Sequence, residues 1–321
     1  MTDAIRIDDI SKRYAGHVAV DRLSLAVPAG TIYGILGPNG AGKSTTLRMI
    51  MNIIGRDSGS ISMLGADPAA DRKVLRRVGY LPEERGLYKK MKVLDVIVFF
   101  AALKGVPEAQ GRTQGREWLE RMGLSEWENA RVETLSKGMQ QKVQFITTIL
   151  HRPDLLILDE PASGLDPVNQ EVLRDTILGA RSEGRTVLFS THNMDQAEQL
   201  CEHVCIIAEG RKVLDGNLRE VKRSHMGNRY EVEFERESPA IQEQLRPGNG
   251  TFTTVTALRD GTAFELELSR GADTHTVLGV LSRIDVPILR FARVQPSLHE
   301  IFVQRVTGAV TPHRRPEEAH V

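Results

Sequence analysis

The segment GPNGAGKST, Gly37–Thr45, has the residue types and the spacing needed to hold phosphate. It matches the pattern G-x-x-x-x-G-K-[ST] and lies between an expected apolar strand, TIYGILG, and an expected helix from Lys43. Glycines let the backbone point its N–H groups at phosphate oxygens, while Lys43 adds positive charge and the Ser44 hydroxyl suits Mg²⁺. The alternative is a glycine turn before a helix. The predicted phosphate-binding residues are Gly37, Pro38, Asn39, Gly40, Ala41, Gly42, Lys43, Ser44 and Thr45.

A second segment, LLILDEP at Leu155–Pro161, supplies two acids at the end of an apolar strand. Ligands of open α/β sheets bind at the carboxyl ends of the strands, where Asp159 would lie. Asp159 would hold Mg²⁺ through water, and Glu160 would polarise an attacking water as a general base. Two solvated acids ending a strand are the alternative.

A third segment, LSKGMQQKV at Leu135–Val143, also suits phosphate because Ser136 and Gly138 stand where a helix is expected to begin. The unpaired N–H groups and the dipole of a helix N-terminus favour anions. A single chain needs only one triphosphate site, so this second site raises the question of whose phosphate it holds.

The elements that position these segments form a mostly parallel α/β core with a helical insertion. Residues 5–10 and 20–27 alternate like strands and are expected to form antiparallel N-terminal strands. LLILD and TVLFS are continuous apolar runs typical of buried parallel strands. Each run is followed by a helical pattern, which gives repeated β-α units. Residues 84–150 are mostly helical in pattern.

The pattern changes after residue 222, where shorter alternating strands predict a small α+β unit. Its expected elements are a strand in NRYEVEFERE, two strands around an Asp260–Gly261 turn, a helix over 273–284, the strand ILRFARV and the helix SLHEIFVQRV. The predicted organisation is a domain at 1–222, with its helical part at 84–150, an accessory domain at 223–307, and a disordered tail at 308–321.

Composition and charge narrow the class of protein. The chain has 321 residues, enough for about two domains, and its 42 basic residues balance 42 acidic ones. Charge therefore gives no reason to expect nucleic acid or an anionic membrane as a partner. Cys201 and Cys205 flank His203; buried thiols at a helix–strand junction are favoured over a zinc site. The N-terminus lacks a signal peptide, and Val93–Leu103 falls short of the ~20 residues that span a bilayer.

Taken together, GPNGAGKST, LSKGMQQKV, LLILDEP, SGLDP and STH resemble, in order and spacing, the ATP-binding cassette (ABC) ATPases over roughly residues 4–222. The resemblance implies ATP and Mg²⁺ as ligands. It also implies that two cassettes pack head to tail, with Ser136 and Gly138 of one holding the γ-phosphate of ATP bound at Lys43 of the other. The partner cassette is a second copy or a homologous chain. Lys137 and Met139 depart from the commoner family form; Lys137 either adds charge near the nucleotide or points to solvent.

Four further residues carry roles by the same resemblance. Tyr14 would stack on adenine, or is an ordinary strand-edge tyrosine. Asp166 would couple the two sites, or is a helix cap before Pro167. His192 would contact the γ-phosphate, or is structural. Glu83 stands where the family usually has a glutamine that reaches Mg²⁺ and the attacking water, and a carboxylate there adds negative charge.

The resemblance further implies an ATPase subunit that dimerises on ATP and powers a separate polytopic membrane permease from the cytoplasmic side of the membrane. The helical insertion and the loop at Glu83 would grip the permease, and Val93–Leu103 either joins that surface or packs inside the insertion. YLPEERGLYKKM and the ending PSLHEIFVQRV resemble bacterial exporters, so export of an unidentified substrate is expected. The alternatives are a soluble ABC ATPase of translation or DNA repair and a regulator that does not hydrolyse ATP.

Overall fold

The computed structural model describes residues 2–84, 86–248, 250–259 and 261–307. It forms two compact units, the first built from the chain up to Leu218 with the helical stretch from Phe302, and the second from Arg219–Ile301. The predicted boundary between residues 222 and 223 falls within helix α7, Leu218–Ser224. The tail predicted at 308–321 lies outside the described residues.

A six-stranded sheet forms the centre of the first unit, in the order β5-β6-β7-β3-β8-β9. The first five strands in this order run parallel, and β9 pairs antiparallel with β8. The apolar runs predicted as buried strands are β6 and β7, in which every residue is buried. The strands are β3 Ile32–Leu36, β5 Val78–Leu81, β6 Leu155–Asp159, β7 Thr186–Thr191, β8 His203–Ala208 and β9 Arg211–Asn217.

A three-stranded antiparallel sheet, in the order β2-β1-β4, packs on the same core. Its strands are β1 Asp3–Tyr14, β2 His17–Pro28 and β4 Ser58–Met63. Leu47 and Ile50 of helix α1, Lys43–Ile50, join this core. The mixed α/β fold predicted from sequence, with antiparallel N-terminal strands, is therefore confirmed.

Helices α5 and α6 follow β6 and β7 as the β-α pattern predicts. Helix α5, Pro167–Ser182, begins where the Asp166 carboxylate accepts the N–H of Asn169 and proline takes the first position. Helix α6, Met194–Leu200, begins where the side-chain oxygen of Asn193 accepts the N–H of Gln196, and Cys201 is its C-cap. Cys201 and Cys205 are both free and buried at this helix–strand junction.

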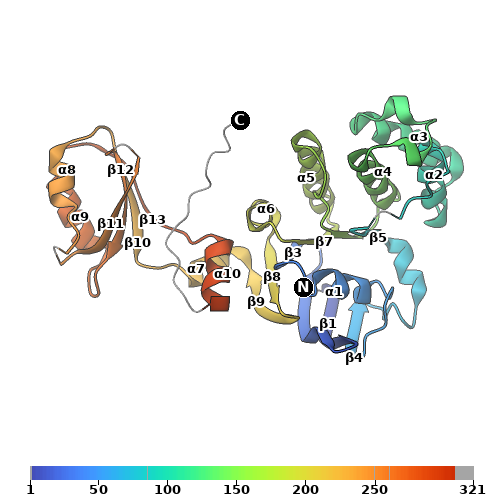
Figure 1. Ribbon diagram of the computed structural model, residues 1–321, viewed down its shortest axis with the longest axis horizontal. Helices are drawn as coiled ribbons and strands as arrows, with labels where there is room; N and C mark the ends of the chain where they lie inside the picture. The colour runs from blue at the N-terminus through green and yellow to red at the C-terminus, as the bar shows by residue number, and fades with distance from the viewer. Residues whose placement is uncertain (1, 85, 249, 260, 308–321) are drawn as a thin grey trace. The chain divides into compact units, whose positions relative to one another are not determined.

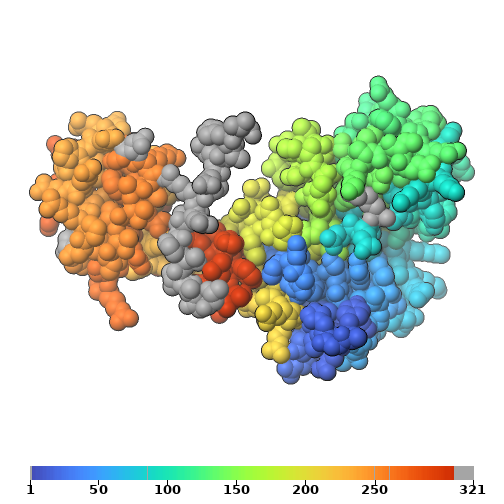
Figure 2. Space-filling view, in the orientation of Figure 1, coloured from blue at the N-terminus to red at the C-terminus, as the bar shows by residue number. Residues whose placement is uncertain are grey.

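The helical insertion contains α2, Val93–Leu103, α3, Glu108–Arg121, and α4, Lys137–Ile149. These helices gather into one group beside β5 (Figure 1) and form the cyan-to-green lobe of the first unit (Figure 2). Gly115 lets α3 lie close to α2, because a Cβ there would stand 3.0 Å from Leu94 Cδ1. The short 3₁₀ helices of the unit are Arg72–Arg77, Ser125–Trp127 and Val132–Thr134.

The second unit is an antiparallel sheet, in the order β11-β12-β10-β13, with α8 and α9 on one face (Figure 1). Alternate residues of its strands point into one core with both helices. Its elements are β10 Arg229–Phe234, α8 Pro239–Gln244, β11 Phe252–Arg259, β12 Ala263–Leu268, α9 Thr274–Leu281, β13 Ile288–Arg293 and, up to Ile301, the start of α10, Leu298–Thr307. Of the predicted Asp260–Gly261 turn, residue 260 lies outside the described residues. Within the described part of the chain, no helix has the length and apolarity needed to cross a membrane.

Candidate functional site

The glycine-rich loop between β3 and α1 has backbone conformations that only glycine adopts readily. Gly37 has a φ of +149° and Gly42 a φ of +103°. A Cβ at Gly37 would lie 2.1 Å from the Ile207 carbonyl oxygen, and a Cβ at Gly42 would lie 2.4 Å from that of Ala19. These glycines therefore allow the tight backbone curl on which a phosphate cradle depends.

A pocket of about 340 Å³ opens over this loop. The predicted site residues that line it are Tyr14, Asn39, Gly40, Ala41, Gly42, Lys43, Ser44, Thr45, Glu83 and Glu160. His17 and Ala19 complete the lining, while Gly37 and Pro38 stand at the start of the loop outside it. The fold thus brings Tyr14, Glu83 and Glu160 together with the loop, although they are far apart in the sequence.

The Lys43 ammonium group lies inside the loop. Its Nζ donates to the carbonyl oxygens of Gly37 at 2.8 Å and Pro38 at 3.2 Å. The same Nζ stands 3.4 Å from Glu160 Oε1, and the lysine side chain is only 6% exposed. A buried cation held between loop carbonyls and one carboxylate is placed to bind an oxyanion that enters the loop.

Three oxygen-bearing side chains converge next to Lys43. The Ser44 hydroxyl donates to Asp159 Oδ1 at 3.1 Å and lies 3.4 Å from Glu83 Oε2. Hydroxyl and carboxylate oxygens are the ligands that Mg²⁺ prefers, and Mg²⁺ sites commonly use one or two carboxylates with substrate phosphates.

Asp159 supplies a more specific sign of a cation site. Its carboxylate is fully buried, and Oδ2 has no hydrogen-bond partner among the described residues. Burial raises the pKa of Asp159, while hydrogen bonds from Ser190 and Ser44 act to lower it. A buried carboxylate oxygen without a partner is costly unless a cation or water satisfies it, so these residues fit Mg²⁺.

Two side chains hold the Glu160 carboxylate. His192 Nδ1 lies 3.0 Å from each of its oxygens, and Lys43 Nζ lies 3.4 Å from Oε1. The Glu160 backbone has a φ of +47°, and its N–H donates to the carbonyl and the hydroxyl of Ser190. An uncommon left-handed backbone fixed by two hydrogen bonds aims this carboxylate into the pocket.

The two residues of the LSKGMQQKV segment do not line this pocket. Ser136 is the N-cap of α4, where its hydroxyl accepts the N–H of Met139 at 3.2 Å. A Cβ at Gly138 would lie 3.1 Å from the Gly164 carbonyl oxygen, so α4 begins against the SGLDP turn. The helix N-terminus predicted as a second anion site thus exists, and it is separate from the glycine-rich loop.

For three other residues, the structure is compatible with both of the interpretations given from the sequence. Asp166 caps α5, and the hydrogen bond from the Asn169 N–H lowers its pKa; its coupling role stays a prediction. Tyr14 is 48% exposed at the end of β1, with Lys12 Nζ 5.6 Å from its ring centre. Lys137 is exposed at the first position of α4.

The sequence interpretation did not include Ser190 or His17. Ser190 donates to Asp159 Oδ1 at 2.5 Å and accepts the N–H of Glu160 at 3.1 Å. Ser190 ends the apolar run TVLFS, two residues before His192. This position was the feature of the sequence from which its role could have been predicted. His17 pairs with Tyr14 across the turn between β1 and β2, and so reaches the same pocket.

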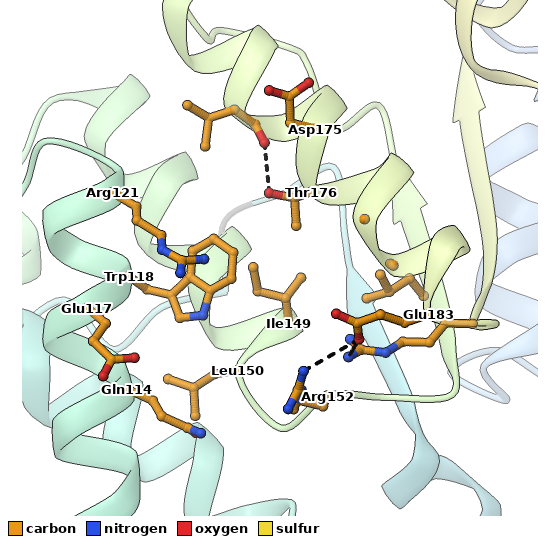
Figure 3. Close-up of a pocket in the computed structure, with 15 residues that line it drawn as sticks. Gln114, Glu117, Trp118, Arg121, Ile149, Leu150, Arg152, Asp175, Thr176 and Glu183 are labelled. Carbon is orange, nitrogen blue, oxygen red and sulfur yellow. Dashed lines mark hydrogen bonds and ion pairs between the residues drawn. The ribbon is translucent and has the colours of Figure 1, made fainter.

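The first unit has further pockets outside the one over the glycine-rich loop. One of about 610 Å³ adjoins Glu160 and His192 and extends along α5 and α6. Another of about 620 Å³ lies between α3, α4 and α5 (Figure 3). Trp118 and Arg121 form one wall of the latter, and the ion pair of Arg152 with Glu183 lies across from them. None of the predicted site residues lines it.

The loop, its lysine and serine, and the acid ending a neighbouring strand define a P-loop nucleotide-binding protein. Residues 20–163 match the ABC transporter family, and residues 216–306 match the family described as ATP-binding protein DrrA1-3-like, C-terminal domain. The chain belongs to the ATP-binding subunits of ABC transporters. Such subunits bind ATP, generally with Mg²⁺, dimerise and work with membrane permeases.

Relatives match nearly the whole chain. The ABC transporter ATP-binding protein YhaQ of Bacillus subtilis is 40% identical over 95% of this chain and 99% of its own length. The daunorubicin/doxorubicin resistance ATP-binding protein DrrA of Streptomyces peucetius is 33% identical over 99% of this chain and 96% of its own. A solved ATP binding subunit of an ABC transporter, 30% identical, superposes with a TM-score of 0.64 over 69% of this chain and 92% of its own.

Proposed function

We propose that this chain hydrolyses ATP to ADP and phosphate and thereby powers a separate membrane permease. The observation that carries the proposal is the carboxylate of Glu160, which lines the pocket of the glycine-rich loop between Lys43 at 3.4 Å and His192 at 3.0 Å. A carboxylate held by a cation and an imidazole at a phosphate site is arranged for general-base chemistry.

Each residue has a role in that reaction. The loop N–H groups and Lys43 bind the phosphates, and Tyr14 stacks on the adenine. Glu160 takes a proton from a water whose oxygen bonds to the γ-phosphorus, while the bond from that phosphorus to the bridging oxygen of ADP breaks. His192 keeps the carboxylate of Glu160 oriented.

Ser44, Asp159 and Glu83 would hold Mg²⁺, which when bound neutralises charge on the phosphate oxygens. Asp159 supports this assignment because its buried Oδ2 has no partner among the described residues. Glu83 supports it because its carboxylate approaches the Ser44 hydroxyl at 3.4 Å.

The active species is a dimer that closes on two ATP molecules. Ser136 and Gly138 would hold the γ-phosphate of ATP bound at Lys43 of a second copy, and Asp166 would couple the two sites. Their exclusion from the pocket of their own chain supports this arrangement, since one triphosphate does not need two phosphate sites on one chain.

The permease is expected to bind the helical insertion and the loop at Glu83, which places the chain at the cytoplasmic side of the membrane as a peripheral subunit. Export is the favoured direction, because the relatives include a drug-resistance protein and a Nod factor export ATP-binding protein of Paraburkholderia xenovorans that is 36% identical over 76% of this chain and 81% of its own length. Relatives that are transporter subunits also favour transport over an ATPase of translation or DNA repair.

The first test is Glu160→Gln, which keeps the shape of the side chain and removes the base. Hydrolysis should fall by roughly 10²-fold or more, while ATP binding persists and ATP shifts the protein from monomer to dimer mass. Light scattering across a range of protein concentrations measures the mass. A variant that hydrolyses ATP at the wild-type rate would refute the role of Glu160.

The second test concerns the partner. The protein is captured from gently solubilised native membranes, and what accompanies it is identified by mass spectrometry. A stoichiometric polytopic membrane protein is expected. Ribosomal or repair proteins with intact ATPase activity would instead refute the transporter function.

A further inference from the structure

The aromatic ring of Tyr14, at the end of β1, has a lysine of the same strand beside it. Lys12 comes two positions earlier, and its Nζ stands over the ring, 5.6 Å from the ring centre. A cation within about 6 Å of the centre of an aromatic ring is attracted to the negative face of the ring. One face of the Tyr14 ring is therefore held by a positive charge.

A carboxylate from another part of the chain fixes this lysine. Asp57, directly before β4, accepts Lys12 Nζ on Oδ1 at 2.8 Å and the backbone N–H of Arg13 on Oδ2 at 2.7 Å. The N–H of Asp57 donates to the Ser11 carbonyl oxygen at 2.9 Å. The hydrogen bond from Lys12 lowers the pKa of Asp57, and the lysine side chain is only 17% exposed. One carboxylate therefore holds the strand just before Tyr14 and the cation over its ring.

The ring still presents surface to the pocket over the glycine-rich loop. Tyr14 lines that pocket, whereas Lys12 and Asp57 do not. Tyr14 is also 48% exposed, so Lys12 leaves much of its side chain uncovered. In the reaction proposed above, adenine stacks on this uncovered part.

Lys12 is poorly suited to bind the phosphates itself. It already forms an ion pair with Asp57, so the two side chains together carry no net charge. The lysine that lines the pocket and lies inside the glycine-rich loop is Lys43. The effect of Lys12 on a nucleotide must therefore pass through the ring that it contacts.

We propose that Lys12 is a positioning residue for the base of the nucleotide: held by Asp57, its ammonium group fixes the Tyr14 ring in the orientation that stacks on adenine. The proposal rests on the function proposed above, in which Tyr14 binds the adenine of ATP. In this role Lys12 touches neither the nucleotide nor the metal.

The physical basis has two parts. An exposed tyrosine loses rotamer freedom when a base stacks on it, and a contact that restricts the ring beforehand reduces this cost of binding. The cation also draws π-electron density toward one face, which leaves the other face less negative and so less repelled by an electron-rich purine. Both effects act on the base and leave the phosphates unaffected.

The experiment compares two ligands that share a triphosphate chain and differ in the base. The probes are the β,γ-imido analogue of ATP, which is not hydrolysed, and inorganic tripolyphosphate. Each is titrated into the purified full chain by calorimetry with Mg²⁺ present. Lys12→Met keeps the aliphatic part of the side chain without the charge, while Lys12→Arg keeps a cation that can contact both the ring and Asp57.

Arg6→Met is the matched control. Arg6 lies on the same strand and also pairs with a carboxylate, that of Asp3 at 2.7 Å, but it does not line the pocket. Its loss removes one cation from β1 and leaves the contact between Lys12 and Tyr14 in place.

Lys12→Met should raise the Kd of the ATP analogue about four-fold and leave the Kd of tripolyphosphate unchanged. Unchanged binding of tripolyphosphate also shows that the glycine-rich loop remains folded. Lys12→Arg and Arg6→Met should bind both ligands as the wild type does. If Lys12→Met weakens both ligands equally, or weakens neither, the proposal is overturned.

The same substitution is then made without the ring. Tyr14→Leu alone should raise the Kd of the ATP analogue about five-fold or more, because base–aromatic stacking is lost. Adding Lys12→Met to Tyr14→Leu should change that Kd by less than about 1.5-fold, since residues that act through one another are not additive. A further four-fold loss in the absence of the ring would show that Lys12 acts by another route, against the proposal.

The proposed function and this inference fail in distinguishable ways. If Glu160→Gln hydrolyses ATP normally, the ATPase mechanism is wrong. If Tyr14→Leu binds the ATP analogue as tightly as the wild type, the assignment of Tyr14 to adenine is wrong. If Tyr14→Leu weakens binding of the analogue but Lys12→Met does not, only the role of Lys12 is wrong.

Discussion

The hydroxyl of Ser190 donates a hydrogen bond of 2.5 Å to Asp159 Oδ1, inside the six-stranded sheet. The same hydroxyl accepts the backbone N–H of Glu160 at 3.1 Å. The two residues face each other because β6 and β7 pair in parallel with Asp159 opposite Ser190. One serine on a neighbouring strand thus holds the acid assigned to Mg²⁺ and the backbone of the acid assigned to base catalysis.

Ser190→Ala should therefore weaken both the fold and the site. It leaves a buried carboxylate oxygen and a backbone N–H with fewer partners, which costs about 1–3 kcal/mol of the free energy of unfolding. The ATPase rate should fall and require more Mg²⁺. Urea unfolding and Mg²⁺ titration measure the two effects. Ser182→Ala is the matched control, because that hydroxyl is exposed and, among the described residues, bonds only to the Gly179 carbonyl oxygen of its own helix. Equal unfolding midpoints for the two variants would contradict the prediction.

His151 makes stability depend on pH in a defined direction. Burial lowers its pKa from 6.5 to about 4, so the unfolded chain binds the proton more tightly than the folded one. The contribution of the neutral ring is present above pH 6.5 and is lost as the pH falls from 6.5 to about 4. His151→Gln should therefore lose less stability than the wild type across this window, as measured by urea unfolding at each pH. His275→Ala, at an exposed histidine, is the control and should show the wild-type dependence of unfolding free energy on pH. If the curve of His151→Gln runs parallel to that of the wild type, the effect of His151 is disproved.

Gly42→Ala should disrupt the loop far more than Gly40→Ala. Both glycines have positive φ, at +103° and +80°, but only the Cβ at Gly42 would meet backbone, 2.4 Å from the Ala19 carbonyl oxygen. Gly40→Ala should cost about 1–2 kcal/mol of stability from its backbone conformation alone. Gly42→Ala should cost about 3 kcal/mol or more and abolish binding of a fluorescent ATP analogue. Retained binding in Gly42→Ala would show that the loop tolerates a side chain.

Arg229 stabilises the second unit through two poorly exposed carboxylates, with ion pairs of 3.0 Å to Glu265 and 3.1 Å to Glu300. Arg229→Ala should lower the free energy of unfolding by about 3 kcal/mol, because it removes the cation from both acids. Arg290→Ala, whose pair with Glu231 is 3.6 Å long and whose side chain is 59% exposed, should cost less than about 1 kcal/mol. Thermal unfolding of the full chain measures both variants. Equal decreases in the unfolding midpoint would contradict the buried character of the Arg229 ion pairs.

Much of the fold was predictable because its signals are local. The apolar runs of β6 and β7 are buried over their whole length, and helices begin at the expected caps, Ser136 and Asp166. The helix–strand junction at Cys201 and Cys205 implied a strand where β8 lies, but the pairing of β8 with β9 was not predicted. They form an antiparallel pair at the edge of an otherwise parallel sheet, and no local spacing indicates which sheet they join.

The sequence by itself determined the glycine-rich loop, its lysine and serine, and the acids that end β6, because neighbours in the chain form these features. Only the tertiary structure decided that Ser190 holds Asp159, that Glu83 approaches Ser44, and that Gln144 binds the backbone around Glu83. These contacts join residues 31, 39 and 60–62 positions apart. They depend on strand register and helix packing, which the whole core sets and no single segment encodes.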